Sequence, residues 1–397
     1  GEGLEARLGD LKDRIHRGSY RAQPSRRVFI PKADGLKRPL GVAALEDKIV
    51  QRAVAEVLNA IYEADFLGFS YGFRPNRGQH DALDAIVVGI ETQRVNWILD
   101  ADIKGFFDNI NHDWMMRFIE HRVGDQRVLR LIRKWLKAGV IEDEVRVEAI
   151  KGTPQGAVIS PLLANIYLHY VYDLWVEQWR KRHARGDVIV VRYADDTIVG
   201  FQHRADAERF LVELRIRMAK FGLELHPAKT RLIEFGKFAA FNRNKRGKRK
   251  PETFNFLGFT HICSKTRQGR FLVVRHTRSD RRRAKLKEIK EELRRRWHLS
   301  IAEQGRWLRR IVMGYFAYHA VPTNSHSLRG FRRHVVRLWL RALRRRSQRD
   351  RTTWNSMWKL AARWLPLVRV SHPWPYERFR GNHPRWEPYA GMPPVRI

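Results

Sequence analysis

Two adjacent acidic residues, Asp195 and Asp196, stand between two short apolar runs of the chain, 188–191 and 198–201. Apolar runs on both sides of such a polar pair predict two β-strands joined by a tight turn. Carboxylates at the tip of a turn project together, and their mutual repulsion is costly unless divalent cations neutralise it. The alternative is an ordinary polar turn, because Asp is a favoured turn residue.

A second acidic segment, residues 97–103, completes a candidate metal site. It predicts a half-buried strand whose apolar side chains face the core, while Asp100 and Asp102 face away from it. Transfer of a nucleotidyl group needs two Mg²⁺ ions about 3.5–4 Å apart, one to activate the attacking 3′-hydroxyl and one to hold the triphosphate. We therefore expect Asp102 and Asp195 to bridge two Mg²⁺ ions, and Asp196 to add negative charge. Asp100 is a secondary candidate, because a carboxylate there can instead satisfy neighbouring backbone groups.

The charge of the chain indicates a polyanionic partner. Among its 397 residues, 78 are Lys or Arg and 42 are Asp or Glu, which gives a formal net charge of +36. A folded chain with this charge repels itself unless a polyanion screens it, and nucleic acid is the natural partner. Composition alone leaves open a basic protein that binds phosphate backbones without chemistry. Only the internal motifs separate these two classes of protein.

The remaining composition is that of a folded protein. A hydrophobic share of 43% and an aromatic share of 11% predict a packed core, divided over two or three lobes in a chain of this length. The single cysteine, Cys263, excludes a disulfide or a cysteine-clustered zinc site within one chain. There is no signal-peptide pattern and no apolar run near the roughly eighteen residues that a membrane span needs. We expect a protein of the bacterial-like cytoplasm, associated with nucleoprotein and without a membrane partner.

The order of the predicted elements is that of an α+β protein. Residues 1–44 predict a short helix and then strand, turn and strand, and 45–61 has the three-and-four spacing of an amphipathic helix. Short strands alternate with helices through the middle of the chain, including a helix over 161–177. Residues 241–300 then hold 20 Lys or Arg against 5 Asp or Glu, and much of the following chain has a helical pattern. The Pro- and Arg-rich end after residue 365 is expected to be irregular coil.

Short motifs in a fixed order surround the two acidic segments. The turn Tyr193-Ala194-Asp195-Asp196 and the segment 102–108 are accompanied by five further blocks, which are Ile30-Pro31-Lys32, Arg38-Pro39-Leu40-Gly41, Ser70-Tyr71-Gly72-Phe73-Arg74-Pro75, Gly152-Thr153-Pro154-Gln155-Gly156 and Ser160-Pro161-Leu162-Leu163-Ala164-Asn165. In these blocks and their order the chain resembles the reverse transcriptases encoded by group II introns. A four-residue turn alone is weak evidence, whereas ordered blocks over residues 26–260 are strong evidence.

The resemblance implies an α+β, right-hand-like polymerase whose fingers and palm combine an antiparallel sheet with helices, followed by a helical basic thumb and maturase domain. The implied segments are an N-terminal extension with fingers at 1–95, a catalytic palm with inserted fingers elements at 96–262, the thumb and maturase domain at 263–365, and a Pro/Arg-rich tail at 366–397.

The resemblance also implies which residues bind the incoming deoxynucleoside triphosphate (dNTP). Lys32 and Arg38 match fingers residues that clamp the triphosphate, where fixed cations oppose the charge on phosphoryl oxygens. Gln155 matches a residue that contacts the nucleotide, between glycines that let the backbone approach closely. Phe107 matches the aromatic ring that excludes a ribose 2′-hydroxyl. The alternatives are a solvated basic loop, a Gly/Pro turn and a core phenylalanine.

Two further groups of residues are implied in the same way. Lys229 matches the lysine proposed as general acid for the pyrophosphate leaving group, with an ordinary surface lysine as the alternative. The implied metal ligands are Asp102, Ile103 and Asp195. The hairpin that would grip the primer, which as an aromatic core strand would look the same, contains Phe256, Leu257 and Gly258.

Residues 278–365 resemble more loosely the segment of this family that binds structured intron RNA and assists splicing. The implied function is an RNA-directed DNA polymerase that uses two Mg²⁺ ions, an RNA template, a DNA primer or target and dNTPs, and that helps intron RNA in splicing and mobility (retrohoming). No HNH-type DNA endonuclease follows, so priming at a replication fork is expected. A domesticated relative in phage defence or DNA repair, and a splicing cofactor with an idle polymerase site, remain alternatives. The oligomeric state stays open, with a monomer on RNA as one option.

Overall fold

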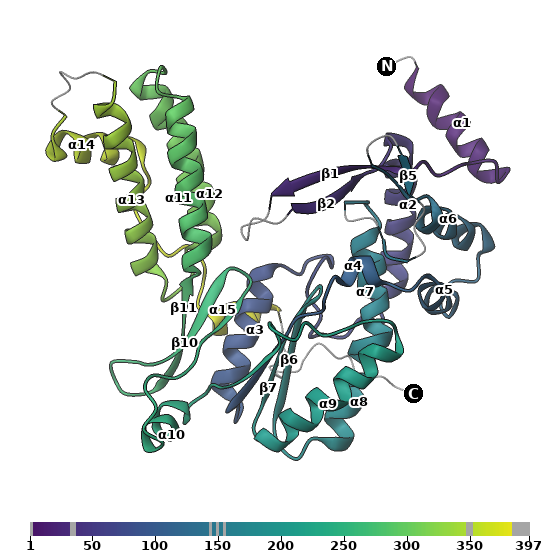
Figure 1. The fold of residues 1–397 in the computed structure, drawn as a ribbon, viewed down its shortest axis with the longest axis horizontal. Helices are drawn as coiled ribbons and strands as arrows, with labels where there is room; N and C mark the ends of the chain where they lie inside the picture. The colour runs from purple at the N-terminus through teal and green to yellow at the C-terminus, as the bar shows by residue number, and fades with distance from the viewer. Residues whose placement is uncertain are drawn as a thin grey trace. The chain divides into compact units, whose positions relative to one another are not determined.

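The chain forms two compact units, seen in a computed structural model (Figure 1). The first unit is built from residues up to 82 and from 93–233, and the second from 83–92 and 234–386. The expected boundary between palm and thumb, at 262/263, falls inside the strand β10 (Phe259–Lys265). The residues that the structure describes are 3–31, 37–142, 145–147, 151–153, 156–346 and 352–382.

The first unit begins with a helix and a β-hairpin, as its sequence predicts. The hairpin strands β1 and β2 are antiparallel, with Arg26 opposite Val42 and Ile30 opposite Arg38. β1 also pairs in parallel with β4, so the sheet order is β2-β1-β4-β5. These elements are α1 (Leu4–His16), β1 (Ser25–Pro31), β2 (Lys37–Val42), α2 (Leu45–Tyr62), β4 (Val140–Glu142) and β5 (Val145–Val147).

A second sheet of the first unit has the order β6-β7-β3-β8 and carries the acidic residues. Its strands are β3 (Trp97–Ala101), β6 (Val188–Tyr193), β7 (Asp196–Phe201) and β8 (Arg231–Glu234). The helices that accompany it are α4 (Phe106–Asn109), α5 (His112–Glu120), α6 (Gln126–Lys137), α7 (Ser160–Leu168), the π-helix η1 (His169–Asp173), α8 (Leu174–His183) and α9 (Arg204–Lys220). Most of the helix α3 (Gln79–Thr92) belongs to the second unit, which includes residues 83–92.

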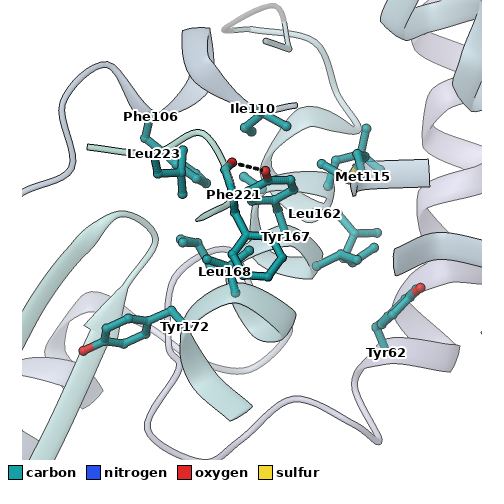
Figure 2. Packing of buried hydrophobic residues seen from close by; sticks show 14 of the residues in the cluster. Tyr62, Phe106, Ile110, Met115, Leu162, Tyr167, Leu168, Tyr172, Phe221 and Leu223 are labelled. Carbon is teal, nitrogen blue, oxygen red and sulfur yellow. Dashed lines mark hydrogen bonds between the residues drawn. The ribbon is translucent and has the colours of Figure 1, made fainter. Parts of the chain in front are cut away.

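One face of this sheet is buried against α8 and α9. The ring of Phe201 in β7 lies 5.3 Å from that of Phe210 in α9 and 6.2 Å from that of Trp179 in α8, measured between centroids. In the core of the first unit the hydroxyl of Tyr167 donates to the backbone carbonyl of Phe221 at 2.7 Å, the bond drawn in Figure 2. Burial raises the pKa of Tyr167 to about 12, so this hydroxyl stays a donor inside the apolar core.

The second unit combines an antiparallel sheet of order β11-β10-β9 with helices. The helix α12 begins with a capping box, in which Ser300 and Glu303 bond each other's backbone N–H. Trp339 is fully buried and donates from Nε1 to Gln304 Oε1 at 3.0 Å. The elements are α10 (Ala239–Lys245), β9 (Phe254–Phe256), β10 (Phe259–Lys265), β11 (Phe271–Thr277), α11 (Ser279–Arg295), α12 (Ile301–His319), α13 (Ser325–Arg344), α14 (Trp354–Trp364) and α15 (Pro375–Asn382).

The helix α15 corrects the expectation of irregular coil after residue 365. Its first residue is Pro375, and proline is well accommodated there because the missing N–H would be unsatisfied anyway. Glu377 accepts from the backbone N–H of Trp374 at 3.1 Å, and Phe379 is buried. The high proline content therefore marks a helix start as well as coil. Among the described helices, none has both the length and the apolar character needed to cross a membrane.

Candidate active site

The strand register brings the two acidic segments to one end of the second sheet. Ala101 of β3 lies opposite Thr197 of β7. One residue further along both strands, the same register sets Asp102 opposite Asp196. Adjacent strands are about 4.7–4.9 Å apart, so the backbones that carry these acids are neighbours. Asp195 belongs to the turn between β6 and β7, next to Asp196.

Side-chain alternation sends these acids to the face that α8 and α9 do not cover. In β3, Leu99 and Ala101 are buried, while the side chains of Asp100 and Asp102 are 22% and 27% exposed. Asp196 is exposed. From residue 99 to residue 103 this alternation is the one that the sequence predicts, whereas Ile98, on the face of the acids, is fully buried. It leaves the carboxylates accessible to a substrate from one side of the sheet.

The backbone carbonyl of Ile103 points toward the β7 side of the chain, where the β6–β7 turn lies. Ile103 forms an isolated antiparallel bridge with Leu225, and the neighbouring carbonyl of Asp102 accepts from the N–H of His226 at 2.7 Å. In an antiparallel ladder, carbonyls of consecutive residues point to opposite edges of the strand. The Ile103 carbonyl is therefore directed away from Leu225, toward the β7 side.

The donor set at this sheet end suits Mg²⁺, which prefers oxygen ligands. Within the described ranges, no three His, Cys, Asp or Glu side chains lie close enough to hold a metal ion by themselves. Protein Mg²⁺ sites commonly use one or two carboxylates and are completed by substrate phosphates and waters. Carboxylates of Asp102 and Asp195, with the Ile103 carbonyl, fit a site of that kind.

Basic side chains accompany the acids on β3. Nζ of Lys229 lies 3.3 Å from Oδ2 of Asp102, and Nη2 of Arg231 lies 3.6 Å from Oδ2 of Asp100. Lys229 is 63% exposed, so its ammonium group is also accessible from solvent. The structure thus brings together two residues, Asp102 and Lys229, that the sequence assigns separately to catalysis.

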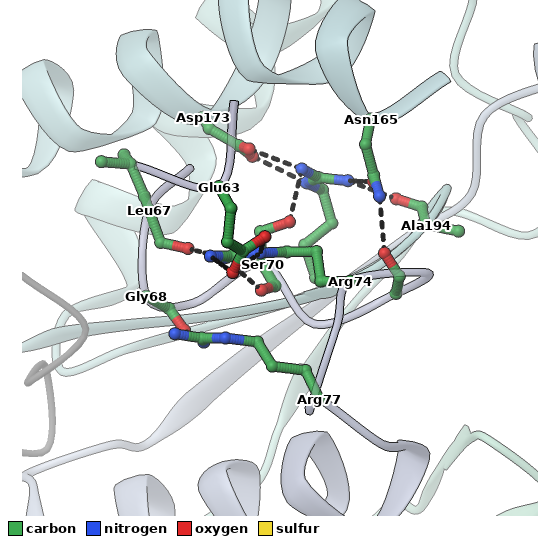
Figure 3. Close-up of polar contacts among 11 residues, drawn as sticks. Glu63, Leu67, Gly68, Ser70, Arg74, Arg77, Asn165, Asp173 and Ala194 are labelled. Carbon is green, nitrogen blue, oxygen red and sulfur yellow. Dashed lines mark hydrogen bonds and ion pairs between the residues drawn. The ribbon is translucent and has the colours of Figure 1, made fainter. Parts of the chain in front are cut away.

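A fully buried arginine, Arg192, holds the turn that carries Asp195, and Figure 3 labels its partners Ser70, Asn165, Asp173 and Ala194. Arg192, the residue before Tyr193-Ala194, donates to both carboxylate oxygens of Asp173 in η1, at 2.7 and 2.5 Å. It also donates to the backbone carbonyl of Ala194, to Oδ1 of Asn165, both at 3.0 Å, and to Oγ of Ser70 at 2.7 Å. Every side-chain partner is buried. One guanidinium therefore ties the turn to three other segments of the unit.

Gly72 lies against the same turn from the other side. A Cβ at this position would come within 2.9 Å of the backbone carbon of Tyr193 and closer still to the backbone nitrogen of Ala194. The Gly72 carbonyl accepts from Nδ2 of Asn165 at 2.6 Å, and the N–H of Tyr71 donates to the Arg192 carbonyl at 2.8 Å. The block that begins at Ser70 is thus a backbone support for the turn between β6 and β7.

Sequence reasoning did not assign a role to Arg192, Asp173 or Asn165. For Arg192 and Asp173 the sequence does contain a usable signal, because each is a charged residue within an apolar run that is expected to be buried. A buried charge needs a partner of opposite sign and further hydrogen bonds. The two apolar runs do not indicate that Arg192 and Asp173 pair with each other.

The residues expected to contact the nucleotide are placed in part. Phe106 is buried, and Phe107 is half-buried and packed against the core, so its contact with a sugar stays a prediction. The N–H of Thr153 donates to the Phe107 carbonyl at 2.8 Å. A Cβ on Gly156 would lie 2.7 Å from the carbonyl oxygen of Gly41 in β2, and its φ is +110°. The glycines flanking the Gln155 segment thus permit close backbone contacts to α4 and to the hairpin.

The structure describes less of the other three residues that are predicted to contact the dNTP. The backbone of Arg38 lies in β2, opposite Ile30. Lys32 and Gln155 lie outside the described residues. Their roles stay predictions.

The predicted primer grip is a two-residue turn between β9 and β10. Phe256 pairs with Phe259, and the turn residues Leu257 and Gly258 have φ of 43° and 81°. Positive φ at both central positions is the pattern of a type I′ hairpin turn, which is unusual for leucine. Tyr318 of α12 fixes the turn by donating to the Leu257 carbonyl at 2.8 Å. Phe256 is buried, so Leu257 and Gly258 are the parts accessible to a primer.

The sheet behind this hairpin carries a neutral histidine. His261 is fully buried, its ring is stacked on that of Phe254 at 4.6 Å, and burial lowers its pKa to about 3. The charge of Arg275 on the neighbouring strand acts in the same direction. The histidine next to the β9–β10 turn is therefore neutral at neutral pH, while the buried Arg275 opposite it keeps its charge beside Asp84.

A sheet that places acids from two adjacent strands at one end, beside a glycine-rich segment and a basic hairpin, defines the palm and fingers of a right-hand polymerase. Residues 30–261 match the family model described as reverse transcriptase (RNA-dependent DNA polymerase). The chain therefore belongs to the reverse transcriptase family. This confirms the resemblance found in its motifs and the expected α+β polymerase fold.

Individual relatives agree with this assignment. The chain is similar to Protein YkfC of Escherichia coli, with 34% identity over 68% of this chain and 75% of that protein. It is also similar to group II intron-encoded protein LtrA of Lactococcus lactis, with 42% identity over 46% of this chain. The match covers only 30% of LtrA. In fold, the chain resembles telomerase of Candida albicans, with a TM-score of 0.50 and 12% identity over 88% of this chain and 58% of that one.

Proposed function

We propose that this chain extends a DNA primer along an RNA template at the site formed by Asp102, Asp195 and Asp196. The observation that carries the proposal is the register of β3 against β7, which ends with Ala101 opposite Thr197 and so brings Asp102 and Asp196 to the same end of the sheet. Membership of the reverse transcriptase family supports the same reaction. A basic protein that only binds RNA has no need of clustered, accessible carboxylates on a strand end.

The roles of the acids follow from their chemistry. Two Mg²⁺ ions, held by Asp102, Asp195 and the carbonyl of Ile103, would activate the primer 3′-hydroxyl and neutralise the triphosphate. Asp196 adds negative charge that favours cation binding. Lys229 holds a proton at Nζ, close to Asp102, and is suited to donate it to the departing pyrophosphate.

Four further residues act on the substrate in this proposal. Lys32 and Arg38 clamp the triphosphate, and their fixed charges oppose the charge that grows on its oxygens. Gln155 contacts the incoming nucleotide, and Phe107 lies under its sugar and disfavours a ribose. The primer end rests on the hairpin turn at Leu257 and Gly258.

The second unit is proposed to bind structured RNA and to assist the splicing and mobility of a group II intron. Its helices α11 to α13 are rich in exposed Arg and Lys, which supply the electrostatic part of RNA binding. The similarity to a group II intron-encoded protein supports an intron RNA as the partner.

The test is primer extension by the wild-type chain with Mg²⁺, dNTPs and a DNA primer annealed to an RNA template. We expect template-directed extension that chelation of the divalent cations abolishes. If the chain binds the primed RNA and incorporates no nucleotide, the polymerase proposal is wrong and a splicing cofactor with an idle site is the remaining function.

A further inference from the structure

A groove with a cationic rim lies between α11 and α13, which run side by side in the second unit (Figure 1). Its volume is about 300 Å³, the lower end of the range for small-ligand pockets. The floor is apolar, because Leu293 is buried and Leu338 and Ala342 are half-buried. One wall is the indole of Trp297, which is 57% exposed. An exposed tryptophan over an apolar floor leaves a flat surface on which another ring can stack.

The rim of this groove consists of four exposed cations and no acid. The lining cations are Lys290, Arg294, Arg341 and Arg345. Within the described part of the chain, none of the four has an ion-pair partner. Neighbouring basic residues differ in this respect, since Arg295 and Arg296 both pair with Glu292. The groove therefore concentrates positive charge that the protein itself does not neutralise.

The chemistry of the groove selects its ligand. Arginine and lysine bind phosphate oxygens, and a base stacked on an aromatic side chain contributes about 1–3 kcal/mol. A stretch of acidic peptide would engage the rim but would leave the indole face without a partner. A nucleotide in which the base is not paired presents both an accessible π-face and flanking phosphates.

We propose that this groove binds one unpaired RNA nucleotide, with its base stacked on Trp297 and the flanking phosphates held by Arg294, Arg341 and their neighbours on the rim. The proposal rests on the proposed RNA-binding function of the second unit and makes it specific. A bulge or loop in the RNA is selected, because a paired base inside a duplex cannot reach the indole. The volume admits a single nucleotide and not a longer segment.

The test compares binding of two probes, an RNA hairpin with a single-nucleotide bulge and its fully paired counterpart. We expect Trp297→Ala to weaken binding of the bulged hairpin by about 10-fold and binding of the paired hairpin hardly at all. Trp297→Phe should retain most of the preference, because the ring can still stack. Arg341→Ala should weaken both probes, and the bulged one more strongly.

Matched controls exist on the same unit. Trp374, 50% exposed, does not line the groove, and Arg337 is an exposed residue one turn before Arg341 on α13. Trp374→Ala and Arg337→Ala should leave the preference for the bulge unchanged. Equal losses for Trp297→Ala and Trp374→Ala, or equal losses on both hairpins, would overturn the proposal. Wild-type binding of both hairpins without a preference for the bulge overturns the groove proposal alone, whereas the absence of binding to either hairpin also overturns the proposed RNA binding by the second unit.

Discussion

Asp195→Asn is expected to reduce the rate of primer extension on an RNA template by at least about 10³-fold, with little change in affinity for the primed template. The physical reason is that the substitution removes a charged oxygen donor at the place where the triphosphate must be neutralised. The nucleic acid itself is held by basic surfaces elsewhere, so its binding should persist. Single-turnover extension and a separate binding measurement give the two quantities.

Two further variants sharpen this expectation. Asp102→Asn should reduce the rate of primer extension as much as Asp195→Asn does. The double variant should reduce the rate hardly further, because the effects of residues that act as a unit are not additive. Asp113→Asn is the matched control, since Asp113 is an exposed carboxylate at the start of α5 in the same unit. Loss of activity in the control, or full activity in Asp195→Asn, is incompatible with the assigned site.

The second large effect is expected at the buried pair under the catalytic turn. Asp173→Asn leaves the guanidinium of Arg192 without a counter-charge in a fully buried position. Removing one partner of a buried ion pair typically costs about 3–5 kcal/mol of unfolding free energy. The midpoint of urea unfolding of the first unit should therefore fall strongly.

A paired substitution separates stability from positioning. Arg192→Met with Asp173→Leu removes both charges, and we expect it to recover part of the lost stability. The rate of primer extension should stay about 10²-fold below that of the wild type, because the hydrogen bond from Arg192 to the Ala194 carbonyl is also lost. Small displacements of groups that position the substrate lower the reaction rate strongly. Wild-type activity in this double variant would show that the arginine supports stability only. Arg122→Met, at a partly exposed ion pair with Asp65, is the control for loss of an arginine.

The local patterns in the sequence predict much of the palm. The apolar runs around Asp195 and Asp196 are the strands β6 and β7, and the predicted alternation agrees with the burial of residues 99–103 but not with the buried Ile98. These features are predictable because a strand with one accessible face must alternate. The helix over 45–61 follows from its spacing in the same way, and α2 covers Leu45–Tyr62.

The supports of the site are set by contacts between segments that are distant in the chain, and the sequence does not reveal these. Arg192 finds Asp173 because a π-helix separates α7 from α8, and no spacing rule predicts that element. A glycine is required at position 72 because the backbone of the β6–β7 turn comes very close to it. The sequence does not predict this contact, because a glycine in a turn-rich block is ordinary. The register that joins Asp102 to Asp196 likewise depends on the pairing of β3 with β7, whose partners lie almost one hundred residues apart.

A metal site shared by Asp102 and the Asp195-Asp196 turn can be tested directly with Fe²⁺ in place of Mg²⁺. Bound Fe²⁺ generates hydroxyl radicals in the presence of ascorbate and peroxide, and these cut the chain next to the metal. The account predicts cuts near residue 102 and near residues 195–196 together, both lost in Asp102→Asn and both suppressed by excess Mg²⁺. Cuts at one of the two segments alone, or cuts that survive the substitution, would contradict a shared metal site.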